Sequence, residues 1–177
     1  MPLAHLIGAT PHLSPLLRKA RHLGYANPDD LLHLAVARGC RHYKPSDSSS
    51  ESIRDCGRKR FSNAELAVAL LSGSLEGDAR HVRVAAQLLG APDVSVSKVA
   101  RLAQMERCVP ILRYIAEAGY REDQAGQSFW KLLLESLPEA GPIKEGRMPH
   151  PSRFMSQPGW SPPSRPSRHA SWLRAHG

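Results

Sequence analysis

The sequence lacks several features that define large classes of protein. It has three cysteines in 177 residues, an odd number without regular spacing, which argues against a disulfide framework and predicts a cytoplasmic protein. No apolar run approaches the roughly 20 residues that cross a bilayer. Residues 1–10 also lack the basic and apolar regions of a secretory signal. We therefore expect no membrane partner.

Motifs for catalysis and cofactor binding are missing as well. The chain has no phosphate-binding loop that ends in Gly-Lys-Ser/Thr and no glycine fingerprint for a dinucleotide. It also has no His-Glu-x-x-His and no Cys-x-x-Cys pair. We therefore expect a protein that is not an enzyme and that uses no cofactor.

The nearest approach to a metal site lies between the first and second cysteines. Cys40, His42 and Cys56 carry ligand types that zinc prefers, and His33 could supply a fourth ligand. Asp30 and His33 also share a helical face, which suits a metal, a proton relay or a plain charge pair. Structural zinc sites usually contain two closely spaced pairs of ligands, which this set does not form. We expect no metal here and interpret Cys40 and Cys56 as ordinary linker-end residues and Cys108 as a buried helix residue.

Helix signals recur along the chain, whereas no segment has the pattern of a strand. The N-terminal signals are Ser14-Pro15 with a stop at Gly24, and Asn27-Pro28 with a stop at Gly39. The first of these helices carries Arg18, Lys19, Arg21 and His22, a basic pattern typical of a solvated surface and sometimes of a polyanion contact.

Five further helices are expected between residues 61 and 138, where apolar residues recur at helical spacing. Their signals are the capping box Ser62–Glu65, Asp78, Ser95 or Ser97, Pro110 with a stop at Gly119, and the Phe129–Leu134 stripe before Pro138. The pattern predicts an all-α fold, either a small helical bundle or a short stack of hairpins similar to HEAT or armadillo repeats.

Composition divides the chain into four parts: a helical pair over 1–40, a Ser-rich basic linker over 41–60, a helical core over 61–138 and a disordered tail over 139–177. In the tail, Trp160 and Trp172 could stack on bases or anchor on a partner protein.

Charge follows a similar division. Residues 1–60 carry 10 Lys/Arg against 5 Asp/Glu, residues 61–143 carry 8 against 10, and residues 144–177 carry 6 against 1. The flanks therefore hold the excess positive charge. Such flanks can attract nucleic acid, or can reflect a composition rich in Arg, Ala, Gly and Pro.

Two local segments resemble known helical families. Asp29–Gly39 is similar to one helix of an ankyrin repeat, but no second copy follows at the 33-residue period of that family. Ser95–Tyr120 contains Val-Ala-Arg-Leu-Ala and resembles a helix-turn-helix, which implies that a second helix carries Arg107 and Arg113 toward DNA. Gln104 stands where that family has glycine, and a plain helical hairpin is the competing interpretation.

The sequence favours a non-enzymatic adaptor whose helices bind another protein. The alternative is a nucleic-acid-binding regulator that uses its basic flanks. Its expected nucleic-acid contacts are Arg58, Lys59, Arg60, Arg107, Arg113, Arg165 and Arg168.

Overall fold

The computed structural model describes residues 14–44, 61–73, 75, 78–143, 148–155 and 171–176. Its elements are α1 (Pro15–His22), α2 (Pro28–Val36), α4 (Asn63–Leu71), α5 (Ala79–Leu89), α6 (Val96–Met105), α7 (Val109–Glu122), η2 (Gln124–Gly126), α8 (Gln127–Ser136) and η3 (Pro151–Phe154). These residues contain no strand, so the expected all-α fold is confirmed. No helix in the described ranges has the length and apolarity needed to cross a membrane.

The helix-start and helix-stop signals form the expected local contacts. Ser62 Oγ accepts the Glu65 N–H at 3.2 Å, while the Ser62 N–H donates to Glu65 Oε2 at 2.8 Å. Asp78 Oδ1 accepts two backbone N–H groups in the first turn of α5. Gly24 and Gly39 have φ angles of 90° and 82°, which glycine adopts without a steric penalty. These contacts set the ends of four helices.

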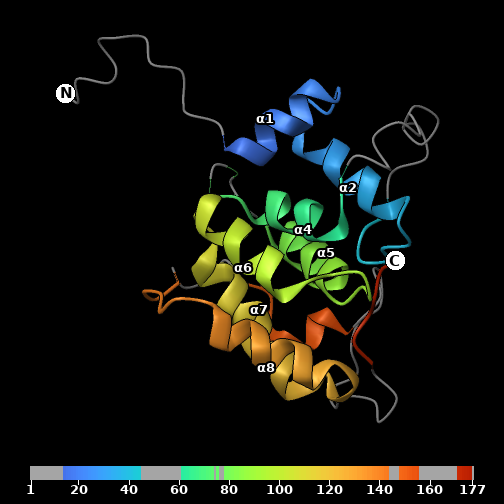
Figure 1. The fold of residues 1–177 in the computed structure, drawn as a ribbon. Coiled ribbons are helices and arrows are strands. Elements are labelled where there is room, and N and C mark those ends of the chain that lie inside the picture. The colour runs from blue at the N-terminus through green and yellow to red at the C-terminus, as the bar shows by residue number, and fades with distance from the viewer. Residues whose placement is uncertain are drawn as a thin grey trace.

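Helix α4 lies at the centre of the bundle (Figure 1). Its sequence is apolar on all sides, and every residue except Glu65 is buried. Helices α1, α2, α5 and α6 contact α4, whereas α7 and α8 pack against each other and against α6. A helix with no polar face is stable only inside a core, so the composition of α4 accounts for its central place.

Helix α7 differs from the expectation that Gly119 ends it. The helix continues through Gly119 to Glu122. A Cβ atom at position 119 would lie 2.4 Å from the Trp130 ring of α8. Glycine therefore permits a close approach of two helices here, instead of providing a stop.

The expected disorder of residues 139–177 does not hold for two segments that the structure describes. Residues 148–155, which include η3, pack against α5 and α7, and residues 171–176 lie along α5. Phe154 and Trp172 are buried, with ring centroids 5.3 Å apart. Average composition predicts disorder, but two aromatic side chains provide enough buried area to hold short segments in place. Residues 144–147 and 156–170 lie outside the described residues.

The 171–176 segment, called the C-terminal segment below, satisfies backbone groups at the end of α5. Trp172 Nε1 donates to the Ala86 carbonyl at 3.1 Å, and Arg174 Nη1 donates to the Gly90 carbonyl at 2.8 Å. The Ala175 N–H donates to the Gln87 carbonyl of α5 at 3.1 Å. The last carbonyls of a helix lack some or all of their helical partners, and this segment supplies additional donors there.

A buried carboxylate joins the C-terminal segment to α7 and α8. Asp123 Oδ2 accepts the indole N–H of Trp130 at 2.7 Å. Both Asp123 oxygens also accept Arg174 Nη2, at 2.7 and 2.6 Å. The side chain of Asp123 is 5% exposed, so its charge depends on these donors for compensation.

Candidate functional site

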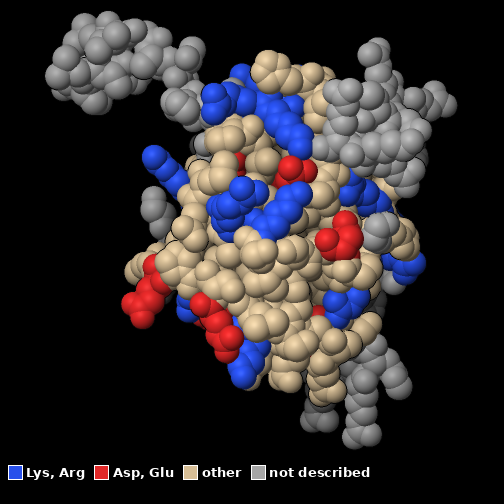
Figure 2. All heavy atoms as spheres, in the orientation of Figure 1, with Lys and Arg blue, Asp and Glu red and all other residues tan. Residues whose placement is uncertain are grey.

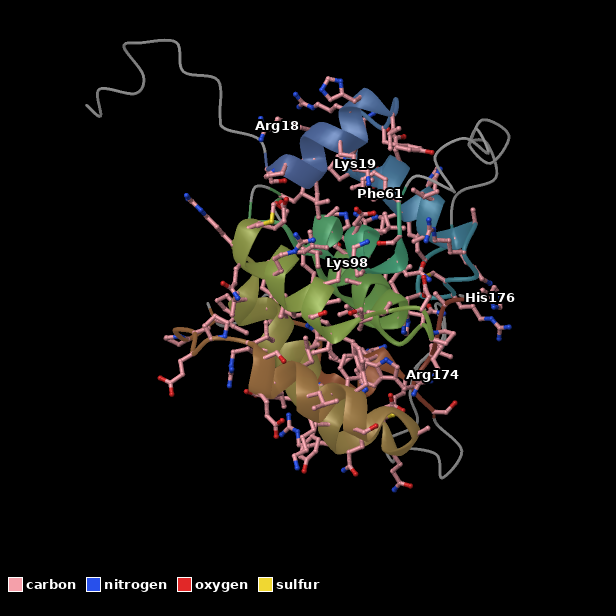
Figure 3. All side chains as sticks on the ribbon, viewed as in Figure 1. Arg18, Lys19, Phe61, Lys98, Arg174 and His176 are labelled. Carbon is pink, nitrogen blue, oxygen red and sulfur yellow. The ribbon has the colours of Figure 1, made fainter. Side chains whose placement is uncertain are left out.

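Two lysines from distant parts of the chain meet at one carboxylate. Lys19 Nζ of α1 lies 3.0 Å from Glu65 Oε1, and Lys98 Nζ of α6 lies 3.8 Å from the same oxygen. The two ammonium groups are therefore at most 6.8 Å apart, the sum of 3.0 and 3.8. In Figure 3, Lys19, Phe61 and Lys98 form a row that leads from α1 toward α6.

Glu65 is held in place by the start of α4. Its other oxygen accepts the Ser62 N–H, and Ser62 Oγ accepts Lys98 Nζ at 2.9 Å. Burial raises the pKa of Glu65, but the Ser62 hydrogen bond and the two ammonium groups outweigh burial and hold the pKa below its ordinary value. Lys19 Nζ also lies 4.8 Å from the Phe61 ring centroid, a cation–π contact. The carboxylate is thus ionised and fixes both lysines.

A second carboxylate, that of Glu106, fixes α1 against the end of α6. Glu106 Oε1 accepts the Leu16 N–H in the first turn of α1 at 2.9 Å, and Oε2 accepts Ser72 Oγ at 3.0 Å. Glu106 is buried. A carboxylate is favourable at a helix N-terminus because of the helix dipole and the unpaired N–H groups there. Contacts at Glu65 and Glu106 therefore set the position of α1 relative to α6.

These contacts create a basic surface, defined here as Arg18, Lys19, Lys98 and Arg101. Arg18 and Arg101 are exposed, and their guanidinium groups form no hydrogen bond or ion pair with another described residue. Neither α1 nor α6 contains Asp or Glu. The four cations and the Glu65 carboxylate sum to +3 (4 − 1). Figure 2 shows basic side chains over α1 and over α6 on one face of the molecule.

The structure separates the two helix-turn-helix arginines. Arg107 is exposed, two residues beyond the end of α6, and has a φ of 55°. Arg113 is half-buried, and its Nη1 donates to the Leu137 and Pro138 carbonyls at 3.2 and 3.3 Å. Arg113 therefore caps the C-terminal end of α8 instead of facing solvent. The other expected contacts, Arg58, Lys59, Arg60, Arg165 and Arg168, lie outside the described residues.

Helix α7 does not have the exposure of a recognition helix. A recognition helix presents its N-terminal residues to base edges, but Val109 and Leu112 in the first turn of α7 are buried. The neighbouring face is also covered, because Tyr114 donates its hydroxyl to the Pro149 carbonyl at 2.9 Å. Helices α6 and α7 therefore form a hairpin inside the bundle.

Sequence reasoning did not identify Lys98 and Arg101 as site residues. The segment from 61 to 143 has a net negative charge, which hides the local excess on α6. The signal that could have found them is the absence of Asp and Glu throughout α6. Their proximity to α1 depends on tertiary packing and leaves no local sequence pattern.

The candidate zinc ligands in the described residues are buried or contact other groups. Burial raises the pKa of the Cys40 thiol to about 12, and His42 Nε2 lies 2.8 Å from the Phe154 carbonyl. His33 Nε2 lies 3.3 Å from the Tyr43 hydroxyl. No group of three or more potential metal ligands comes together in the described ranges. Cys56 lies outside them.

Asp30 and His33 do not form a shared site either, because each side chain contacts a different residue. Asp30 Oδ2 accepts the Asn27 N–H at 2.9 Å, at the start of α2. His33 is engaged by the Tyr43 hydroxyl, and their ring centroids are 5.7 Å apart. Each side chain thus has a local role in the fold.

Burial of His42 predicts a loss of stability in mild acid. Burial lowers the pKa of His42 to about 4 from an ordinary 6.5, although its bond to the Phe154 carbonyl opposes this and Arg83 adds to it. The unfolded chain therefore takes up a proton below pH 6.5 that the folded chain takes up only near pH 4. The free energy of unfolding should fall by about 2 kcal/mol on this account between pH 7.5 and pH 5.

Urea denaturation of the wild type and of His42→Gln at both pH values checks this expectation. Glutamine can still donate to the Phe154 carbonyl but does not titrate. The variant should lose about 2 kcal/mol less than the wild type over that interval. Equal losses in the two proteins would show that His42 is not the responsible group. His81, whose pKa is lowered by burial, is present in both proteins and does not affect the comparison.

Comparison with protein-family models, with curated protein sequences and with solved structures finds no match to this chain.

Proposed function

We propose that this protein binds nucleic acid and that the basic surface of α1 and α6 contacts the phosphates. The observation that carries this proposal is the convergence of Lys19 and Lys98, flanked by two exposed arginines, Arg18 and Arg101. Cations that contact phosphates release condensed counterions, which provides most of the affinity in sequence-independent binding.

The two lysines are held in fixed positions, which favours phosphate binding over side chains that only contact solvent. Both lysines are held by Glu65, and α1 is held at its start by Glu106. Fixed side chains lose less conformational entropy when they bind than mobile ones do. The expected contacts at Arg58, Lys59 and Arg60 directly precede Phe61 in the chain and stay predictions.

Loss of a single exposed arginine should weaken this binding measurably. We expect Arg18→Ala and Arg101→Ala each to reduce affinity about eightfold at 0.1 M salt, and to lower the slope of log K against log salt by about 0.9. Fluorescence anisotropy of the full chain with a labelled 20-base-pair DNA duplex, repeated from 50 to 300 mM salt, measures both quantities.

Arg21→Ala is the matched control. Arg21 is exposed on α1 and has the same charge, but it lines a pocket with Tyr25 and Leu31 on the side of α1 that faces α2. This variant should bind almost as tightly as the wild type. No binding at 50 mM salt, or an equal loss in all three variants, would contradict the proposal.

The adaptor function expected from the sequence stays a prediction. The large exposed apolar side chains of the described residues are Met105, Tyr120 and Leu132, one each on α6, α7 and α8. Isolated apolar residues of this kind are common on protein surfaces and do not define a docking face. A pull-down after nuclease treatment separates the two functions, because a protein complex that survives nuclease would support the adaptor.

A further inference from the structure

We infer that the nucleic acid bound by the basic surface is a duplex, contacted along its phosphates. This inference rests on the proposed function and adds that the nucleic acid is double-stranded. Proteins that bind single strands combine a basic surface with exposed aromatic rings on which bases stack, so the positions of the aromatic rings distinguish the two forms of nucleic acid.

Most of the aromatic side chains in the described residues are buried or half-buried in the fold. The chain has 3 Phe, 3 Trp and 4 Tyr, ten in all, and nine of them lie in the described residues. Tyr120 is the exposed one of these nine, and it lies on α7. The tenth, Trp160, lies outside the described residues.

Trp172, which the sequence offers as a base-stacking residue, is instead part of the core. Its ring lies 5.0 Å from that of Trp130 and 5.3 Å from that of Phe154. Phe61, the ring closest to the lysine pair, is 1% exposed and serves as a cation–π partner for Lys19. Neither ring can accept a base without unfolding part of the core.

The exposed neighbours of the four cations do not supply a stacking platform either. On α1 they are Pro15, Arg21 and His22, and on α6 they are Ser97, Gln104 and Met105. The imidazole of His22 is the single aromatic ring in this set. The surface therefore offers charge and small polar or flexible groups, which suit a phosphate backbone.

Charge density favours a duplex for a surface of this kind. Double-stranded DNA carries one negative charge per about 1.7 Å of axis, against about 3.4 Å for each strand. Lys19 and Lys98, at most 6.8 Å apart (3.0 + 3.8), can reach neighbouring phosphates together. With four phosphate contacts, the salt exponents of about 0.9 and 0.7 per contact predict a sixfold preference for duplex at 0.1 M salt.

The test is a comparison of the same labelled 20-nucleotide sequence as a single strand and as a duplex, with the full chain at about 0.1 M salt. We expect the duplex to bind about six times more tightly. The variants Trp160→Ala and His22→Ala should leave the duplex-to-single-strand ratio unchanged. Tyr120→Ala, which removes the exposed ring of α7, should leave it unchanged as well.

Equal or tighter binding of the single strand would overturn the inference and leave the proposed function standing. Single-strand binding that falls on loss of Trp160, His22 or Tyr120, while duplex binding does not, would also overturn it. Failure to bind either form at 50 mM salt would instead remove the proposed function itself.

Discussion

Replacing Trp172 by alanine should lower the free energy of unfolding by about 3–5 kcal/mol, the usual cost of truncating a large buried aromatic residue. The indole is 5% exposed and contacts the rings of Trp130 and Phe154, and its N–H donates to the Ala86 carbonyl. Small domains have a total stability of about 5–15 kcal/mol, so this loss is a large fraction. Urea denaturation followed by circular dichroism measures it.

Two further variants keep this prediction testable if Trp172→Ala fails to fold. Trp172→Phe retains most of the ring contacts and should cost clearly less than the alanine variant. Ser171→Ala alters an exposed neighbour in the same segment and should change stability by less than about 0.5 kcal/mol. Wild-type stability in Trp172→Ala would mean that the C-terminal segment does not pack as described.

Replacing Asp123 by alanine should cost about 3 kcal/mol. This is the lower end of the range for a broken buried ion pair, because the Arg174 side chain is 36% exposed and keeps contact with water. The change also leaves the indole N–H of Trp130 without its acceptor, in a place where water does not reach it.

A double-mutant cycle isolates the Asp123–Arg174 pair. If the two side chains act together, Asp123→Ala combined with Arg174→Gln should cost less than the sum of the single variants, by about 0.5–3 kcal/mol. Strict additivity would show that the short contacts between Asp123 and Arg174 contribute no net coupling.

Local signals in the sequence were sufficient to predict which segments form helices. The Ser62–Glu65 capping box and the Asp78 cap involve residues within one turn, so their hydrogen bonds follow from neighbouring side chains alone. Gly119 shows the limit of this reasoning. A glycine that ends a helix and a glycine that admits a packed tryptophan look the same in sequence, and the difference depends on α8.

The candidate site was less accessible to sequence reasoning because it is assembled across the fold. Arg107 and Arg113 are six residues apart, yet one is exposed and the other caps α8. Lys19 and Lys98 are far apart in the chain, yet they share Glu65. Charge summed over long segments cannot show such proximity, since it averages over faces that point in different directions.

The placement of the C-terminal segment also has a consequence for the rate of folding. Its hydrogen bonds close loops of 86 residues, from Trp172 to Ala86, and 113 residues, from His176 to Asn63. The Leu16–Glu106 bond closes a loop of 90 residues. Helical proteins usually fold fast because their contacts are local, and distant contacts slow the search. We therefore expect the helices to form early in folding. The complete bundle should become stable only when these distant segments of the chain come into contact.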